Sequence, residues 1–148
     1  MSLSERIEKD YVTAFKAKKT DEVAVLRMLK AAVKNKQVDL RRELTDNEIL
    51  DVLAKQVKQR LESIDQFRAA GRIDLAEIEE REHLILRTYL PTALSSTELE
   101  EAVVLTIQTL GASDMKDMGK VMNAILGEHA GRVDGKELSA LVRAKLSS

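Results

Sequence analysis

The chain has 148 residues and contains no cysteine, no tryptophan, one proline and only 3% aromatic residues. Without cysteine there can be no disulfide, no thiol nucleophile and no thiolate zinc site. So few aromatic side chains argue against a reader of single-stranded nucleic acid that stacks bases on rings. No apolar run approaches 18 residues and the N-terminus lacks the apolar core of a signal peptide. We therefore expect no membrane span and predict a cytoplasmic protein.

What the chain does contain favours helices. A third of its residues are charged, 44% are hydrophobic, and no alternating β-branched run indicates a strand. The length suits one or two small domains. The pattern predicts an all-α protein with helices near residues 3–18, 21–42, 46–70, 73–89, 96–110, 114–126 and 135–147.

Several helix starts carry capping signals. Ser2, Thr45 and Ser95 are each followed three residues later by glutamate, the capping-box pattern, and Asp134 has the same spacing. Plainer caps are predicted at Thr20-Asp21 and at Ser113-Asp114. In the helix at 46–70 the predicted apolar stripe comprises Ile49, Leu50, Leu53, Val57, Leu61, Ile64 and Phe67.

Pro91 marks the predicted domain boundary. Proline removes a helical hydrogen bond and clashes with the preceding turn, and a new cap follows at Ser95. We predict an N-terminal domain, residues 1–91, with a four-helix arrangement. The C-terminal domain, residues 92–148, is predicted to be a small three-helix bundle.

Charge is unevenly distributed although the formal net charge is only −1. Residues 16–42 hold nine Lys/Arg against three Asp/Glu, and residues 73–101 hold two against eight. Within the basic segment, Arg27, Lys30 and Lys34 fall on one helical face. This face is either a phosphate-binding ridge, extended by Lys36, Arg41 and Arg42, or an ordinary solvated face.

A second candidate basic surface lies near the C-terminus. Its members are Lys116, Lys120, Arg132, Lys136, Arg143 and Lys145. Gly119 falls inside a predicted helix, where glycine costs roughly 1 kcal/mol relative to alanine. Either close helix packing or a backbone approach to nucleic acid would compensate. Gly131 is predicted to form a turn, with Arg132 and Lys136 available to phosphate.

No catalytic or metal centre is predicted. Glu79, Glu80 and Glu82 are expected to be solvent-facing charges, with His83 paired to Arg87 or Glu79. The two histidines lack metal-ligand spacing. The chain has no phosphate-binding Gly-x-x-x-x-Gly-Lys loop, and no Ser/His/Asp arrangement is evident. We expect no cofactor.

An ordered series of motifs resembles the YqeY family, which is related to the tail of the tRNA-dependent amidotransferase B subunit (GatB). The clearest motifs are Met118-Gly119-Lys120-Val121-Met122, then Gly131-Arg132-Val133-Asp134-Gly135 and a closing helix with Leu138, Leu141 and Val142. Gly71 to Leu75, Tyr89-Leu90-Pro91 and Leu94 to Leu99 also fit. The resemblance covers nearly the whole chain. On matching positions it points to Gly119, Lys120, Gly131 and Lys136.

The resemblance implies a noncatalytic helical module that binds structured RNA, most simply tRNA, alongside an amidotransferase. The amidotransferase to which the family is related is a carbon–nitrogen ligase that uses glutamine as amido donor. The alternative is a protein-interaction or assembly module without nucleic-acid binding, which the slightly acidic total favours. A third reading is a C-terminal helix-turn-helix for DNA, although the predicted turn is longer than usual.

Overall fold

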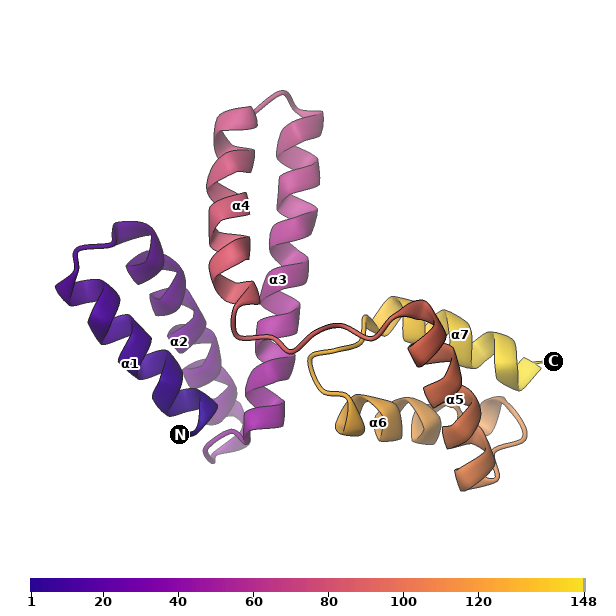
Figure 1. The fold of residues 1–148 in the computed structure, drawn as a ribbon. Coiled ribbons are helices and arrows are strands. Elements are labelled where there is room, and N and C mark those ends of the chain that lie inside the picture. The colour runs from indigo at the N-terminus through magenta and orange to yellow at the C-terminus, as the bar shows by residue number, and fades with distance from the viewer. Residues whose placement is uncertain (148) are drawn as a thin grey trace. The chain divides into compact units, whose positions relative to one another are not determined.

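The computed structural model describes residues 1–147, and over these residues the protein is built from helices without a strand. The all-α prediction is therefore confirmed. The chain divides into two compact units, Met1–Leu90 and Pro91–Ser148. Each unit is described by itself (Figure 1).

The first unit consists of two helical hairpins. Helices α1 (Leu3–Lys16) and α2 (Thr20–Leu40) form one, and α3 (Asp46–Ala69) and α4 (Ile73–Arg87) form the other. Figure 1 shows the members of each hairpin running side by side. Their shared core contains Ile7, Val25, Leu26, Leu29, Val33, Ile49, Leu53, Val57, Leu86 and Tyr89.

The second unit contains α5 (Ser96–Leu110), a 3-10 turn η1 (Met115–Asp117), α6 (Met118–Glu128) and α7 (Gly135–Ser147). Its core is aliphatic, as the composition requires. It comprises Leu99, Val103, Val121, Ile125, Leu138, Val142 and Leu146. The segment predicted as one helix at 114–126 is thus a 3-10 turn followed by a helix that continues to Glu128.

Most predicted caps are present. The hydroxyls of Ser2, Thr45 and Ser95 accept hydrogen bonds from the backbone N–H three residues on, and Thr45 and Ser95 form complete capping boxes. Asp114 caps η1 rather than α6. The predicted cap at Thr20 is wrong, because α2 already begins at Thr20 and the residue before it, Lys19, makes no side-chain cap bond.

Helix α3 buries a different stripe from the predicted one. Ile49, Leu53, Val57 and Ile64 are buried, but the position expected for Leu61 is taken by Arg60. Leu61 is 45% exposed and Arg60 only 6%. The placement of Leu61 in the core is therefore wrong, and the physical reason is an ion-pair cluster described below.

Candidate nucleic-acid interface

Gly119 and Lys120 lie in the first turn of α6. Both are exposed, and Gly119 has no positive φ. A Cβ added at Gly119 would meet nothing within 4 Å, so close packing is not the reason for this glycine. Within residues 1–147 the Lys120 ammonium forms no ion pair or hydrogen bond. The first turn of α6 therefore exposes its backbone at Gly119, next to a lysine that has no ion-pair partner in the described part of the chain.

Arg132 is largely engaged in structure. Its Nε donates a hydrogen bond to the Thr92 carbonyl oxygen at 2.7 Å, and the Leu94 N–H donates to the Arg132 carbonyl oxygen at 2.9 Å. The preceding Gly131 has φ +74°, a conformation that glycine adopts without steric cost. The α6–α7 turn therefore anchors the segment that leads into α5, and Arg132 is half-buried there.

Lys136 and Arg143 project from α7 and are exposed. Neither has a polar side-chain partner in the described part of the chain. Lys145, in contrast, forms an ion pair with Glu100 at 2.9 Å. The predicted C-terminal cations therefore divide into free ones and ones already used for packing.

The free cations do not form one tight cluster. The Ser147 hydroxyl lies 3.6 Å from the Met115 sulfur, so the end of α7 is beside the turn that precedes α6. The two helices are therefore antiparallel, and Lys120 and Lys136 lie near opposite ends of the pair. An 11-residue helix is about 16 Å long. A partner that contacts both lysines must span roughly that distance.

The charge of this unit is not basic overall. Residues 91–148 carry six Lys/Arg and eight Asp/Glu. Several carboxylates are committed to local structure: Glu98 completes a capping box, Asp114 caps η1, and Asp117 accepts from the Ser113 N–H. Hydrogen bonds from the Ser95 backbone and hydroxyl hold the pKa of Glu98 below its usual value. Any attraction for phosphate must therefore be local to the free cations.

The N-terminal ridge, formed by Arg27, Lys30 and Lys34 on α2, mostly faces α1. Arg27 Nη2 donates to the Tyr11 hydroxyl at 3.3 Å. Lys30 Nζ lies 2.5 Å from a Glu8 carboxylate oxygen and 4.2 Å from the centre of the Tyr11 ring. Only Lys34 lacks a polar partner among residues 1–147. Two of the three ridge cations thus hold the first hairpin together.

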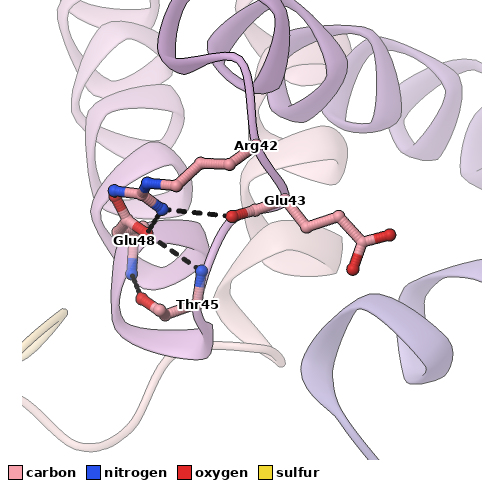
Figure 2. Close-up of polar contacts among 4 residues, drawn as sticks. All are labelled: Arg42, Glu43, Thr45 and Glu48. Atoms are coloured by element: carbon pink, nitrogen blue, oxygen red, sulfur yellow. Dashed lines mark hydrogen bonds and ion pairs between the residues drawn. The ribbon is translucent and has the colours of Figure 1, made fainter.

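The extension of that ridge is neutralised at Arg42. Figure 2 shows its guanidinium bound to both carboxylate oxygens of Glu48, at 2.7 and 2.8 Å, while one nitrogen also donates to the Glu43 carbonyl oxygen. Glu48 in turn accepts from the Thr45 N–H within the capping box. Hydrogen bonding to Arg42, supported by the Thr45 backbone, lowers the pKa of Glu48 from 4.5 to about 2.

A buried charge cluster in the first unit was not predicted. Arg60 Nη1 lies 3.3 Å from Glu79 and 3.2 Å from Glu82, and Nη2 lies 3.8 Å from the Met28 sulfur. The side chains of Glu79 and Glu82 are only 22% and 17% exposed, so the expectation that they face solvent is wrong. Glu80 is more exposed and pairs with Arg68.

His83 lies beside this cluster and makes neither predicted pair. Its Nδ1 is buried without a hydrogen-bond partner, and so is Arg60 Nε. Burial lowers the pKa of His83, assisted by the positive charges of Arg87 and Arg60. Burial raises the pKa of Glu82, while Arg60 acts in the opposite direction. Because one guanidinium lies between two carboxylates, the arrangement is that of an internal ion-pair cluster.

Across residues 1–147 no group of three or more His, Asp or Glu side chains is arranged to hold a metal ion. No helix in the same range is long and apolar enough to cross a bilayer.

Fold and surface together define a small helical protein with two units, each with its own hydrophobic core, and free cations on the second. Residues 4–146 match the YqeY family, described as Yqey-like protein. The chain belongs to this family, as the ordered motifs indicated.

Three similar fungal proteins are each named altered inheritance of mitochondria protein 41, mitochondrial. The one from Clavispora lusitaniae is 34% identical over 116 residues, covering 76% of this chain and 67% of the relative. The one from Kluyveromyces lactis is 31% identical over 139 residues, 93% of this chain and 72% of the relative. The Pyrenophora tritici-repentis protein is 27% identical over 142 residues, 93% and 77% respectively. The word mitochondrial in these names differs from the plain cytoplasmic location predicted above.

Proposed function

We propose that the second unit is a noncatalytic module that contacts structured RNA, with tRNA as the RNA. The observation that carries the proposal is Gly119. A glycine in the interior of a helix costs roughly 1 kcal/mol relative to alanine, so in the first turn of α6 the cost is up to about that amount. Neither backbone conformation nor crowding requires it here, because φ is ordinary and the Cβ position is empty. A partner that approaches the backbone of α6 closely would account for it.

The chemistry beside Gly119 fits phosphate. Lys120 is exposed and free, and Lys136 and Arg143 offer further contacts on the antiparallel α7. Double-helical RNA is recognised mainly through its shape, phosphates and 2′-hydroxyls, which needs few aromatic side chains. The family relationship to the GatB tail supports tRNA as the RNA and an amidotransferase as a protein partner. We propose no catalytic role for the chain alone.

A weak and transient complex is expected. Phosphate-driven nonspecific binding typically has dissociation constants of about 10⁻⁴ to 10⁻⁶ M at physiological salt. The excess of carboxylates in residues 91–148 places this unit toward the weak end of that range. The cellular location is a separate question. The composition favours the cytoplasm, whereas the names of the fungal relatives favour mitochondria.

Gly119→Ala tests the proposal because stability and binding should move in opposite directions. The new methyl group meets open space, so the variant should be more stable by up to about 1 kcal/mol. Binding to bulk tRNA at low salt should nevertheless weaken. Gly127→Ala is the matched control: it too lies in α6 with open space at its Cβ, but two turns from Lys120. It should gain stability and leave RNA binding unchanged.

Charge reversals then locate the surface. The double variant Lys120→Glu, Lys136→Glu should weaken tRNA binding more than Lys30→Glu, Lys34→Glu. The reason is that Lys30 already forms an ion pair with Glu8 within the first unit. The logarithm of the affinity should fall linearly with the logarithm of salt concentration. An absence of tRNA binding at low salt, or binding that neither pair alters, would mean that the RNA proposal must be abandoned.

One observation favours the second candidate, a protein-interaction module. Leu105 on α5 is 64% exposed, and beside it Glu100, Glu101 and Val104 line a shallow hollow. Exposed apolar side chains bordered by acids suit a protein partner rather than RNA. If tRNA does not bind, this face of α5 is the place to test next, with Leu105→Ser assayed against a purified amidotransferase.

A further inference from the structure

The outer part of the α3–α4 hairpin, residues 61–80, lies beyond the core of the first unit. Within this segment Ile64 and Ala76 are buried, and neither belongs to that core. The segment carries six Asp/Glu against two Lys/Arg, and we call it the acidic arm. Two helices that bury so few side chains between them leave most of their surface open to a partner.

One side of the α3–α4 hairpin is marked by the ion pair between Arg68 and Glu80. Residues at helical spacing from these two therefore lie on the same side of the hairpin. On this side exposed apolar residues accompany acids that form no ion pair among residues 1–147. The apolar residues are Leu61 (45% exposed), Ile73 (50%) and Leu84 (64%), and the acids are Asp65 and Glu77.

Leu84 connects this side of the hairpin to the turn between α1 and α2. It lines a shallow hollow of about 460 Å³ together with Lys18 and Lys19. Arg81 Nε lies 3.6 Å from an Asp21 carboxylate oxygen, and this ion pair holds the start of α2 beside α4. Figure 1 shows the α1–α2 turn and the α3–α4 turn at the same end of the unit. The α1–α2 turn therefore continues the side that carries Leu84.

The α1–α2 turn is basic and has a defined backbone. Residues 11–20 contain three lysines and no Asp or Glu. The Lys18 N–H donates to the Phe15 carbonyl oxygen at 3.2 Å, and the Lys19 N–H donates to the Ala14 carbonyl oxygen at 3.0 Å. Lys18 has φ +58°, a conformation that glycine would adopt without strain. Its ammonium has no ion-pair partner in the described part of the chain, and Phe15 beside it is 60% exposed.

The resulting face has opposite charges at its two ends. Asp65 and Glu77 lie on the acidic arm, the lysines lie on the α1–α2 turn, and Leu84 lies between them. Along α4, Glu77 and Leu84 are seven residues apart, about 10 Å. A face with an acidic end, an apolar middle and a basic end is complementary to itself after a two-fold rotation. Phosphate suits it less well, because the acids on the same face repel anions.

We propose that this face pairs with the same face of a second copy of the chain and forms a two-fold symmetric dimer. Asp65 and Glu77 of each protomer lie against the basic turn of its partner. Leu61 and Leu84 of the two protomers meet near the symmetry axis. The contact belongs to the first unit and does not depend on RNA binding by the second. A face of this size, with charged ends, is typical of weak and reversible association.

Sedimentation velocity of the full-length protein, from low micromolar to near-millimolar concentration, is the first measurement. The protein should change from a monomer of 16.6 kDa to a dimer of twice that mass as concentration rises, and no larger species should form. Added salt should weaken the dimer, because its charged ends are exposed to solvent.

A charge exchange identifies the contact. The turn variant, Lys18→Glu with Lys19→Glu, and the arm variant, Asp65→Lys with Glu77→Lys, should each weaken self-association at least about tenfold, since like charges then oppose each other. An equimolar mixture of the two variants should restore a dimer of about the parent affinity. In that mixed dimer both contacts are again between opposite charges.

Two further variants complete the set. Lys34→Glu with Lys36→Glu makes the same change in net charge as the turn variant, at exposed positions of α2 outside the face, and should leave the dimer intact. Leu61→Ser with Leu84→Ser removes the apolar middle and should weaken the dimer at low and at high salt. Circular dichroism melting of each variant checks that its helices are intact.

The proposal is overturned if the parent stays monomeric over the whole concentration range, or if the mixture of turn and arm variants does not restore the dimer. Equal weakening by the control pair Lys34→Glu, Lys36→Glu would show an effect of net charge alone and would also overturn it. Growth beyond a dimer would exclude two-fold pairing. A monomeric parent whose tRNA binding is lost in the turn variant would assign the α1–α2 turn to RNA instead.

Discussion

Removing Arg60 tests whether the buried charge cluster holds the second hairpin in place. Arg60→Ala would leave Glu79 and Glu82 facing each other at low exposure without their shared cation. Breaking a buried ion pair by removing one partner typically costs about 3–5 kcal/mol. The two carboxylates retain about a fifth of their exposure, so we expect a smaller loss, about 2–4 kcal/mol.

The measurement is urea unfolding of the full-length protein followed by circular dichroism, at pH 7 and at pH 4.5. Burial already raises the pKa of Glu82, and loss of Arg60, which lowers it, should raise it further. A carboxyl whose folded pKa is raised binds its proton more readily in the folded state. Its destabilising effect is therefore full at neutral pH and declines as pH falls through that raised pKa toward 4.5. The deficit of Arg60→Ala should accordingly be smaller at pH 4.5.

A triple variant, Arg60→Met with Glu79→Gln and Glu82→Gln, provides the control. Replacing a buried ion-pair cluster by neutral groups of similar volume is often neutral or stabilising. The triple variant should therefore recover most of the stability that Arg60→Ala loses. If Arg60→Ala unfolds within about 0.5 kcal/mol of the parent, the usual limit for surface substitutions, the cluster is not a stabilising element. A deficit that is equal at both pH values would show that the loss is one of packing, not of charge compensation.

Three further predictions follow from the described contacts. Leu53→Ala should cost about 2–5 kcal/mol, as usual for a buried leucine, whereas Leu61→Ala should cost less than about 1.5 kcal/mol because Leu61 is 45% exposed; equal losses in urea unfolding would contradict this. The carboxyl of Glu48 should titrate with a pKa of about 2 by NMR, so its stabilising contribution is present above pH 4.5 and is lost as pH falls toward 2; Arg42→Gln should raise that pKa, and an unchanged value would refute the role of the bridge. The purified chain given glutamine, ATP and misacylated tRNA should release no ammonia, and turnover lost on mutating Glu79 would contradict the noncatalytic proposal.

The sequence predicted helices well where the signal is local. The spacing from Thr45 to Glu48 and from Ser95 to Glu98 identified two capping boxes that are present in the structure. A capping box involves four consecutive residues, so no tertiary information is needed to find it. The start of α2 shows the opposite case, since its N-cap residue, Lys19, makes no side-chain cap bond and is not a residue type that marks a helix start.

The core of α3 shows why a hydrophobic stripe can mislead. Positions 53, 57, 60 and 64 share one face at helical spacing, and so do positions 50, 57, 61 and 64. Hydrophobicity favoured the set with Leu61 because arginine is rarely buried unless paired. The partners that make burial of Arg60 possible, Glu79 and Glu82, lie 19 and 22 residues away. Sequence spacing alone gave no sign of that pairing.

The basic ridge on α2 illustrates the same difficulty for a candidate site. Counting charges identified Arg27, Lys30 and Lys34 as one face, but it did not show what lies opposite. Tyr11 and Glu8 on α1 engage the first two. Whether a surface cation is free depends on its neighbours in space, and only the structure separates Lys34 from Lys30.

Gly119 joins the sequence and structural arguments for function. From sequence alone, close packing and backbone approach to a partner were both acceptable reasons for a glycine inside a helix. The open space around its Cβ position removes packing from consideration and leaves the helix with an uncompensated cost of up to about 1 kcal/mol. A position that lowers stability without any benefit inside the chain is best explained by something outside it. Gly119→Ala therefore distinguishes the possibilities more directly than any charge reversal, because a gain in stability with no change in binding would leave the glycine without a role in RNA contact.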